Sequence, residues 1–287
     1  MITNYLYVVV ALILAMITST PAWAASSVAD KPQTASISLG AEFASGKYGT
    51  ESTTRSLYMP LIATWSPNDR LDIGIEVPFI YQSSSNVTTS LFSIGQSTTN
   101  TTAKGGPGGN SGAAPGNSSA ASSSASSVSG LGDIILRAGY ILLAEKDSQP
   151  QLRTSLLVKT PTASASDGLG TGKFDFGGGL DITKWYGDLH LTGEVLYTYQ
   201  GKASGFDLKN YFSYTAGVGY QLMKNLEPMV IIKGATAPSS YTGSLLEARA
   251  RIIWALSDTT SLDLYGSRGI ADNSPEYDGG IAVIYSF

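Results

Sequence analysis

The sequence contains no cysteine, a single histidine and few charges. Among 287 residues there is no Cys, and only 14% of residues are charged, against about 25% in an average globular protein. Without cysteine, a disulfide scaffold, a thiolate metal site and an N-terminal lipoprotein anchor are excluded. A water-soluble domain of this size would need more charge on its surface.

Two further classes of protein are excluded by the composition. With 43% hydrophobic residues, including 16 Tyr, the chain is too apolar to be disordered. After the first two dozen residues, no stretch reaches the ~18 apolar residues of a membrane-spanning helix. The net charge of −4 argues against a nucleic-acid partner, which would require a basic patch. The remaining class is a β-rich chain with an apolar exterior.

The first 24 residues have the pattern of a secretory signal peptide. An unbroken apolar run from Leu6 to Ile17 precedes an Ala-Trp-Ala sequence that ends at Ala24, which predicts cleavage after that residue. The N-terminal region lacks Lys and Arg, so an uncleaved anchor is the alternative, but twelve apolar residues are too few to span a membrane. We expect residues 1–24 to be removed and residues 25–33 to form a short periplasmic segment.

From residue 34 onward, apolar and polar residues alternate in blocks of roughly ten. In residues 71–79, for example, every odd position is apolar, and a period of two is typical of β-strands. The polar positions carry Ser, Thr, Gly, Tyr and paired charges rather than the Lys and Glu of a soluble sandwich surface. This composition favours the lumen of a transmembrane barrel.

Twelve blocks are predicted to be strands, and the links between them alternate between short and long. The blocks lie near residues 34–44, 53–65, 70–82, 129–143, 151–161, 173–184, 188–200, 209–222, 226–237, 243–256, 259–270 and 276–287. Short periplasmic turns opposite longer external loops are typical of outer-membrane barrels, and an even count places both termini in the periplasm. The prediction is an all-β, transmembrane, antiparallel up-and-down barrel of about 12 strands over residues 34–287.

The longest link, residues 83–128, is of low complexity and has one charged residue, Lys104. Such a segment cannot bury enough apolar surface to fold alone. We expect it to be a mobile external loop. A plug inside the lumen is the alternative.

The end of the chain carries a second outer-membrane feature. Phe287 is the last residue, and Tyr285 and Val283 share its face of the final strand, an arrangement that resembles the assembly signal of outer-membrane barrels. The barrel assembly machinery and outer-membrane lipid are therefore predicted partners. Aromatic residues near strand ends are expected to form girdles at the membrane interfaces: Trp65, Tyr81, Trp185, Tyr186, Tyr199, Tyr211, Tyr220 and Trp254.

Three short motifs suggest a family. They are Gly-Leu-Gly-Asp-Ile at 130–134, Val-Lys-Thr-Pro-Thr at 158–162 and Gly-Thr-Gly-Lys-Phe-Asp at 170–175. Together they resemble the outer-membrane transporters of the meta-pathway of phenol degradation, over about residues 34–287. The resemblance implies a small porin-like barrel in a Gram-negative outer membrane that lets apolar or aromatic compounds cross. The length of the link 83–128 departs from that family.

The alternation also predicts which charged side chains point into the lumen. The candidate lining residues are Arg137, Arg153, Lys159, Asp175, Asp181, Glu194, Glu247, Arg249, Arg251 and Asp263. The same orientation is expected for Glu42, Asp72, Glu76, Asp133 and Lys233. They could form a selectivity lining or an ion-pair network that fills the interior, and both can hold together. We expect the triple Glu247, Arg249 and Arg251 to form a constriction opposite acids such as Asp263 and Glu194.

No catalytic, cofactor-binding or metal site is predicted. His190 is the one possible member of a Ser/His/acid triad, but its position in the alternation points it inward, and no Gly-x-Ser-x-Gly motif accompanies it. The predicted function is an outer-membrane channel for a small-molecule solute that the sequence does not identify. A structural or adhesive barrel and an export channel for a secreted polypeptide are the alternatives.

Overall fold

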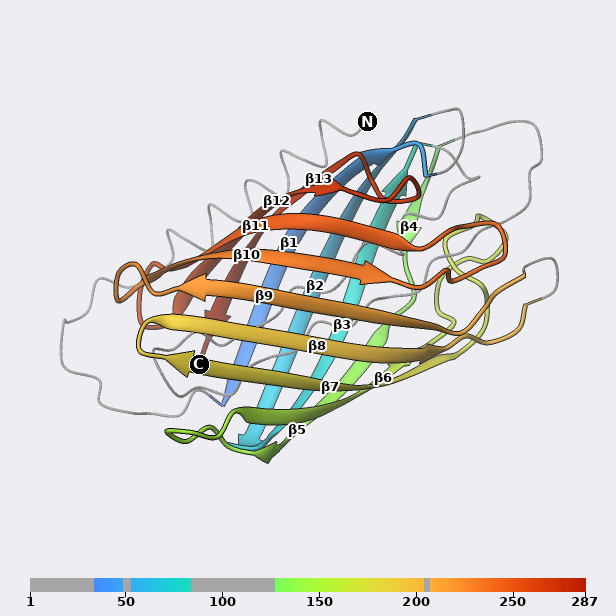
Figure 1. Ribbon diagram of the computed structural model, residues 1–287. Helices are drawn as coiled ribbons and strands as arrows, with labels where there is room; N and C mark the ends of the chain where they lie inside the picture. The colour runs from blue at the N-terminus through green and yellow to red at the C-terminus, as the bar shows by residue number, and fades with distance from the viewer. Residues whose placement is uncertain (1–33, 49–52, 84–126, 204–206) are drawn as a thin grey trace.

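The computed structural model describes residues 34–48, 53–83, 127–203 and 207–287. These residues form a sheet of antiparallel strands in which β1 pairs with both β2 and β13, so the sheet closes into a barrel (Figure 1). The strands are β1 (Ala35–Gly46), β2 (Thr54–Asn68), β3 (Leu71–Gln82), β4 (Val128–Leu131), β5 (Ile135–Leu143), β6 (Gln151–Lys159), β7 (Asp175–Tyr186), β8 (Leu189–Tyr199), β9 (Tyr211–Tyr220), β10 (Leu226–Ala235), β11 (Leu245–Ala255), β12 (Thr260–Gly269) and β13 (Tyr277–Ser286).

The barrel wall has twelve strands, as predicted, because β4 and β5 are two parts of one strand. Both pair with β3, and the residues between them, 132–134, interrupt the ladder opposite Pro78. The amide of Gly132 donates to the carbonyl oxygen of Pro78 at 2.8 Å and bridges the interruption. A proline has no N–H to contribute to the ladder. The predicted strand 129–143 is therefore correct in extent but not continuous.

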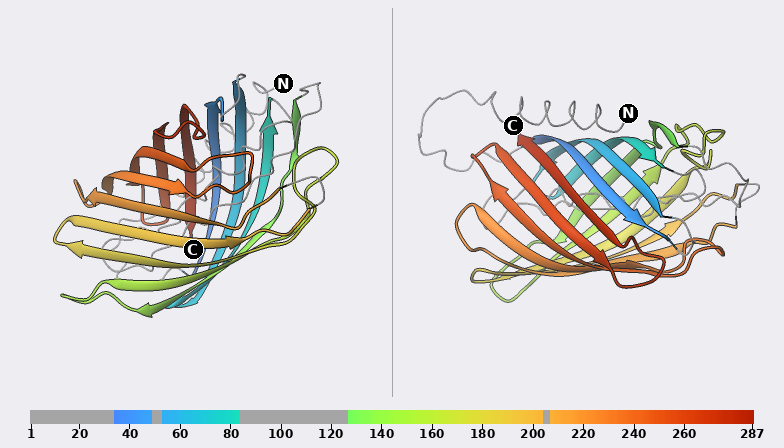
Figure 2. Two further views of the ribbon diagram at one scale, coloured as in Figure 1. Left: turned by 45° about the vertical axis from the view of Figure 1, so that its right-hand side comes forward. Right: turned by 90° about the horizontal axis from the view of Figure 1, so that it is seen from above.

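The two ends of the barrel differ in the length of their links (Figure 2). At one end, the strands are joined by short turns such as Gly187-Asp188, where Gly187 has a φ of 62° that suits a two-residue hairpin. The described termini also lie there, because the amide of Phe287 donates to Ala35 at 2.9 Å. We call this the turn end and the opposite end, which includes residues 160–174, the loop end.

The exterior of the barrel is apolar. In β7, Phe176, Leu180 and Ile182 are exposed, whereas the alternate residues Gly177 and Asp181 face inward. Most other strands repeat this alternation, so large apolar side chains cover the outside, as a lipid-facing surface requires. Among the described residues, no helix has the length and apolarity that a membrane crossing would need.

Two of the predicted girdle aromatics were wrong. Trp185 stacks on the inward-facing His190, with ring centroids 4.3 Å apart, and Tyr211 is buried in the interior. Each has an aromatic neighbour, Tyr186 or Phe212, that takes the outward position, because consecutive strand residues point to opposite faces. The others of the set are exposed or half-buried: Trp65, Tyr81, Tyr186, Tyr199, Tyr220 and Trp254.

Several predictions fall outside the described residues. The signal peptide of residues 1–24, the periplasmic segment 25–33 and nearly all of the link 83–128 belong to this group. β4 begins at Val128, so the last residue of that predicted link belongs to the wall. The remaining boundaries of this domain organisation stay predictions.

Candidate functional site

The interior of the barrel is lined by charged side chains that neutralise one another. The structure places all ten candidate lining residues on the inward faces of their strands, where they are buried or half-buried. Most of them form ion pairs with neighbouring strands. Three groups can be distinguished: one on the β3–β7 wall, one on the opposite wall, and one at the loop end.

The first group joins β2, β3, β5, β6 and β7. A guanidinium nitrogen of Arg137 lies 2.6 Å from Glu76, and the hydroxyl of Tyr58 donates to the same carboxylate. Arg153 bridges two strands, at 2.6 Å from Asp72 and 3.3 Å from Asp181. Buried charges require such partners, so these pairs hold the side chains in place inside the barrel.

The second group lies on the opposite wall, on β10, β11 and β13. Glu247 accepts two cations, with Lys233 at 3.3 Å and Arg249 at 2.9 Å. Arg249 also lies 3.5 Å from Asp278, and its guanidinium carbon is 3.6 Å from the ring centroid of Tyr265. This stacking over an aromatic face fixes the guanidinium.

Of the two acids predicted opposite Glu247, Arg249 and Arg251, the structure places one, Asp263, beside this group and the other, Glu194, elsewhere. Arg251 does form a two-pronged pair with Asp263, with the Nε contact at 2.9 Å. Glu194 belongs to a different wall, where it lies opposite Asp181 in the register of β7 and β8. Glu194 forms no hydrogen bond or ion pair with a described residue. Among the inward carboxylates of the described strands, it is the one without such a direct partner.

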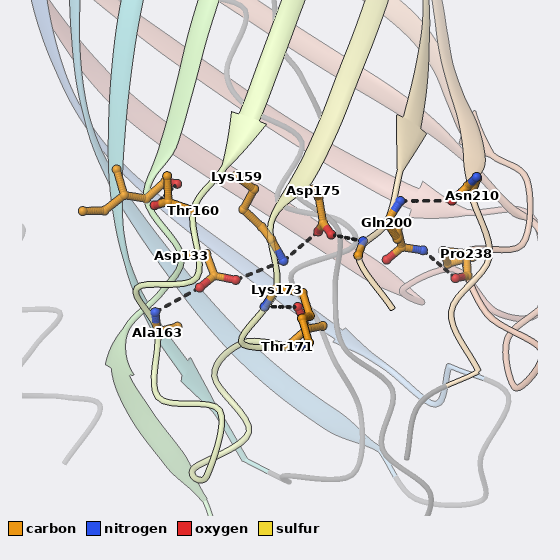
Figure 3. Close-up of polar contacts among 12 residues, drawn as sticks. Asp133, Lys159, Thr160, Ala163, Thr171, Lys173, Asp175, Gln200, Asn210 and Pro238 are labelled. Atoms are coloured by element: carbon orange, nitrogen blue, oxygen red, sulfur yellow. Dashed lines mark hydrogen bonds and ion pairs between the residues drawn. The ribbon is translucent and has the colours of Figure 1, made fainter. Parts of the chain in front are cut away.

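The third group brings the three sequence motifs together at the loop end. Lys159, at the end of β6, lies between Asp133 and Asp175, at 3.0 Å and 2.7 Å (Figure 3). Asp133 accepts a hydrogen bond from the amide of Ala163 at 2.9 Å, and Asp175 accepts one from the amide of Gly201 at 2.8 Å. One residue from each motif therefore forms a buried charge triad, which we call the motif triad.

The other motif residues make the motif triad possible. The hydroxyl of Thr162 accepts from the amide of Ile134 at 2.8 Å, and the hydroxyl of Thr160 donates to the carbonyl of Ile134 at 2.9 Å. At Gly170, a Cβ would lie 2.9 Å from both carboxylate oxygens of Asp133 and from the Cβ of Ala163. Only glycine fits at this position without displacing the carboxylate.

Hydrogen bonds extend from the motif triad along the rim. The amide of Gln200 donates to the side chain of Asn210 at 3.1 Å, and its side-chain nitrogen donates to the carbonyl of Pro238 at 2.7 Å (Figure 3). The links after β8 and β10 are thereby joined to the start of β7 through Gly201. Hydrogen bonds therefore connect neighbouring links over the described part of the loop end.

Two segments turn inward at the loop end and narrow it. Leu169, in the link between β6 and β7, packs with Tyr58 and Ile80, whose side chains point inward from β2 and β3. From the other side, Tyr48 packs with Tyr211 and Leu245 on the wall of β9 and β11. Both segments therefore occupy part of the interior at the loop end.

Some interior residues are not among those predicted from the sequence. Glu227 pairs with Nδ1 of His190 at 2.6 Å, and Asp278 pairs with Arg249. Both positions could have been found, because they alternate with outward apolar residues in their strands. Tyr58 and Tyr265 could have been found in the same way, because Tyr58 alternates with Leu57 and Met59, and Tyr265 lies two residues after the inward Asp263.

Among the residues that the structure describes, the inward-facing carboxyl groups outnumber the inward-facing basic groups. The inward-facing basic residues are Arg137, Arg153, Lys159, Lys233, Arg249 and Arg251. The acidic residues that face inward are more numerous: Glu42, Asp72, Glu76, Asp133, Asp175, Asp181, Glu194, Glu227, Glu247, Asp263 and Asp278.

Comparison with solved structures agrees with this architecture. The crystal structure of an outer membrane channel from Pseudomonas putida F1 superposes with a TM-score of 0.61, covering 92% of this chain and 100% of that one at 14% identity. The KdgM porin in complex with disordered oligogalacturonate gives a TM-score of 0.51, covering 88% and 99% of the two chains at 8% identity. Identities this low show a shared fold alone. None of the curated proteins matches the chain.

These findings define the class of protein. A closed antiparallel barrel with an apolar exterior and a charged interior is a bacterial outer-membrane β-barrel, a fold that it shares with a solved outer-membrane channel. The chain belongs to the family described as "Putative MetA-pathway of phenol degradation", whose sequence profile matches residues 104–287. The match includes all three motifs and begins after β3, so it is shorter than the resemblance over residues 34–287 had suggested.

Proposed function

We propose that the barrel is a passive channel through which small apolar or aromatic solutes cross the outer membrane. The observation that supports this proposal is the mixed character of the interior. Between the charged groups, apolar side chains also face inward, and Met229, Ile231 and Ile253 form one such cluster on β10 and β11. These side chains are buried against one another, so a passing apolar solute would displace them from one another while the neighbouring charges remain paired with each other.

The pairing of the interior charges favours passage over tight binding. Conduction requires contacts that are favourable enough for a solute to enter and weak enough for it to leave. Carboxylates already held by Arg137, Arg153 or Lys233 offer little further attraction to a solute. The excess of acidic groups still disfavours anions. We therefore expect neutral or cationic aromatic compounds to pass through the barrel more readily than aromatic carboxylates.

Liposome swelling with a pair of solutes of matched size tests this proposal. Benzylammonium and benzoate have similar dimensions and opposite charge, and a sugar serves as a polar neutral reference. We expect benzylammonium to enter liposomes that contain the barrel faster than benzoate. Faster entry of benzoate, or of the sugar than of both aromatic ions, would contradict the proposed selectivity.

A structural barrel with a closed interior is the second candidate. It is favoured by the burial of the ion pairs, because Glu76 is fully buried and Lys159 is only 2% exposed. The same assay separates the two functions. A closed barrel would give no swelling above that of protein-free liposomes with any of the three solutes and no single-channel conductance in planar bilayers.

A further inference from the structure

The outer face of the barrel carries very few charges in the described strands, and more of them lie at the loop end than at the turn end. In the described strands, Arg55, Lys184 and Arg268 are the charged residues that point outward. Lys184 lies at the turn end, where it is buried against the adjacent turn and donates to Glu145 at 3.0 Å. Arg55 and Arg268 are exposed at the loop end, and neither guanidinium forms an ion pair with a described residue.

These two arginines belong to one row across four adjacent strands. Arg55 on β2 lies opposite Ser45 on β1, Ser45 lies opposite Tyr277 on β13, and Tyr277 lies opposite Arg268 on β12. We call these four residues the arginine row. Because neighbouring strands are about 4.8 Å apart, three steps separate the two arginine Cα atoms by about 14 Å.

The centre of the arginine row is polar and partly preorganised. Tyr277 is 55% exposed, and its hydroxyl accepts a hydrogen bond from Arg268 at 3.3 Å. The guanidinium carbon of Arg268 also lies 5.2 Å from the tyrosine ring centroid. The row therefore presents two cations with hydroxyl groups between them, all directed to the outside of the barrel.

The next outward row toward the turn end is apolar and nearly flat. It contains Phe43, Gly279 and Gly266, which lie opposite one another on β1, β13 and β12. A Cβ at Gly266 would meet no atom within 4 Å. Open space at this point lets an acyl chain lie against the wall directly below the arginine row.

Two guanidiniums on a lipid-facing wall that have no ion-pair partner among the described residues call for an anionic ligand. A charge there costs about 2–4 kcal/mol at the bilayer midplane but only about 0–1 kcal/mol near the interface, which fits their place at the loop end. Arginine matches phosphate oxygens with two parallel hydrogen bonds. With the longer links on the external side, as is general for outer-membrane barrels, the loop end lies in the leaflet formed by phosphorylated glycolipid.

We propose that the arginine row binds the headgroup of the outer-leaflet glycolipid, a disaccharide that carries a phosphate at each end. Arg55 and Arg268 each take one phosphate, Tyr277 and Ser45 contact the sugars, and an acyl chain lies over Gly279 and Gly266. The wide separation of the two arginines suits a headgroup with two distant phosphates better than a phospholipid with one.

Native mass spectrometry of the purified barrel in a neutral detergent tests this proposal. The probe is hexa-acylated lipid A with two phosphates, and the comparison lipids are monophosphorylated lipid A and phosphatidylglycerol. We expect one tightly bound lipid A, weaker binding of both comparison lipids, and an affinity at least about ten-fold lower in R55Q/R268Q. The matched control is K184Q, which removes the outward charge at the turn end and is expected to bind lipid A normally.

Two results would overturn the proposal. Equal binding of lipid A by the wild type and R55Q/R268Q would show that the row is not the site, and equal affinity for phosphatidylglycerol would show that two phosphates are not recognised. The shift between heated and unheated samples on gels verifies that each variant is folded. If the double variant does not fold, R55Q and R268Q are tested singly, and unchanged lipid A binding in both would be equally decisive.

Discussion

The ammonium group of Lys159 lies 2.7 Å from the carboxylate of Asp175, and both side chains are buried at the loop end of the barrel. The two residues come from different motifs of the family, and Asp133 of the first motif completes the triad at 3.0 Å. The three motifs are separated along the chain and adjacent in space. Their geometry indicates that they secure the link between β6 and β7, not that they contact a solute.

Replacing the central cation of the motif triad is expected to destabilise the loop end. In K159M, Asp133 and Asp175 lose their shared partner, and breaking a buried ion pair from one side costs about 3–5 kcal/mol. The temperature at which the folded band disappears on gels should fall. If the barrel conducts, its single-channel conductance should rise, because Leu169 is no longer held inward.

The control for this experiment is K173M. Lys173 is exposed and lies two residues before Asp175, so the substitution removes a nearby charge without touching the triad. We expect wild-type stability and conductance. Equal stability of K159M and K173M would show that the motif triad does not hold the loop end.

A glycine substitution tests the same region through steric fit. In G170A, the new Cβ would lie 2.9 Å from the carboxylate oxygens of Asp133, so the carboxylate must move away from Lys159. Overpacking of this kind costs about 1–3 kcal/mol, measured as a lower midpoint of urea unfolding. In G178A, the nearest atom is 3.9 Å from the new Cβ, and we expect little change.

The alternation of the sequence predicted the wall of the barrel well, for a simple reason. A period of two determines both the strands and the face on which each residue lies, so Arg251 and Asp263 were correctly placed near each other inside the barrel. Trp185 and Tyr211 were misplaced because residue type was given more weight than position in the alternation.

The loop end could not be predicted in the same way. Residues 160–174 have no alternation, so nothing in the sequence indicated that Leu169 turns inward onto Tyr58 and Ile80. The partners of Lys159 were equally hidden, because they come from links and strand ends that lie close together only in the closed barrel. The motifs indicated a family, but they did not predict the ion pairs that Lys159 forms with Asp133 and Asp175.

The excess of interior carboxylates predicts the ion selectivity of the channel. We expect the reversal potential in a salt gradient to indicate a preference for cations. Neutralising Arg249 and Arg251 in R249Q/R251Q should increase that preference, whereas R268Q, on the outer wall, should leave it unchanged. An unchanged preference in R249Q/R251Q would mean that these arginines only fill the interior.

A further interior variant uses the inward carboxylate of Glu194, for which no direct partner is found in the described part of the chain. Glu194 lies opposite Asp181, and like charges across a strand pair are destabilising. E194Q should therefore leave the unfolding midpoint equal to or higher than that of the wild type. A marked loss of stability would instead indicate that the Glu194 carboxylate has a structural partner outside the described residues.

The last residue is predicted to act in assembly through its ring. Phe287 is 60% exposed, and its ring lies edge-on to Tyr285 with centroids 5.0 Å apart. The backbone of Phe287 is separately held by Ala35 and Thr34, so F287A removes the ring and keeps these hydrogen bonds. We expect less F287A in the outer membrane and more unassembled protein in the periplasm, measured by fractionation and immunoblotting.

F176A removes an outward phenylalanine that is 51% exposed from β7, far from the C-terminus, and should assemble normally. Equal membrane levels of F287A and F176A would show that the terminal ring is not an assembly signal, whereas equal loss of both would show a general need for apolar surface on the wall.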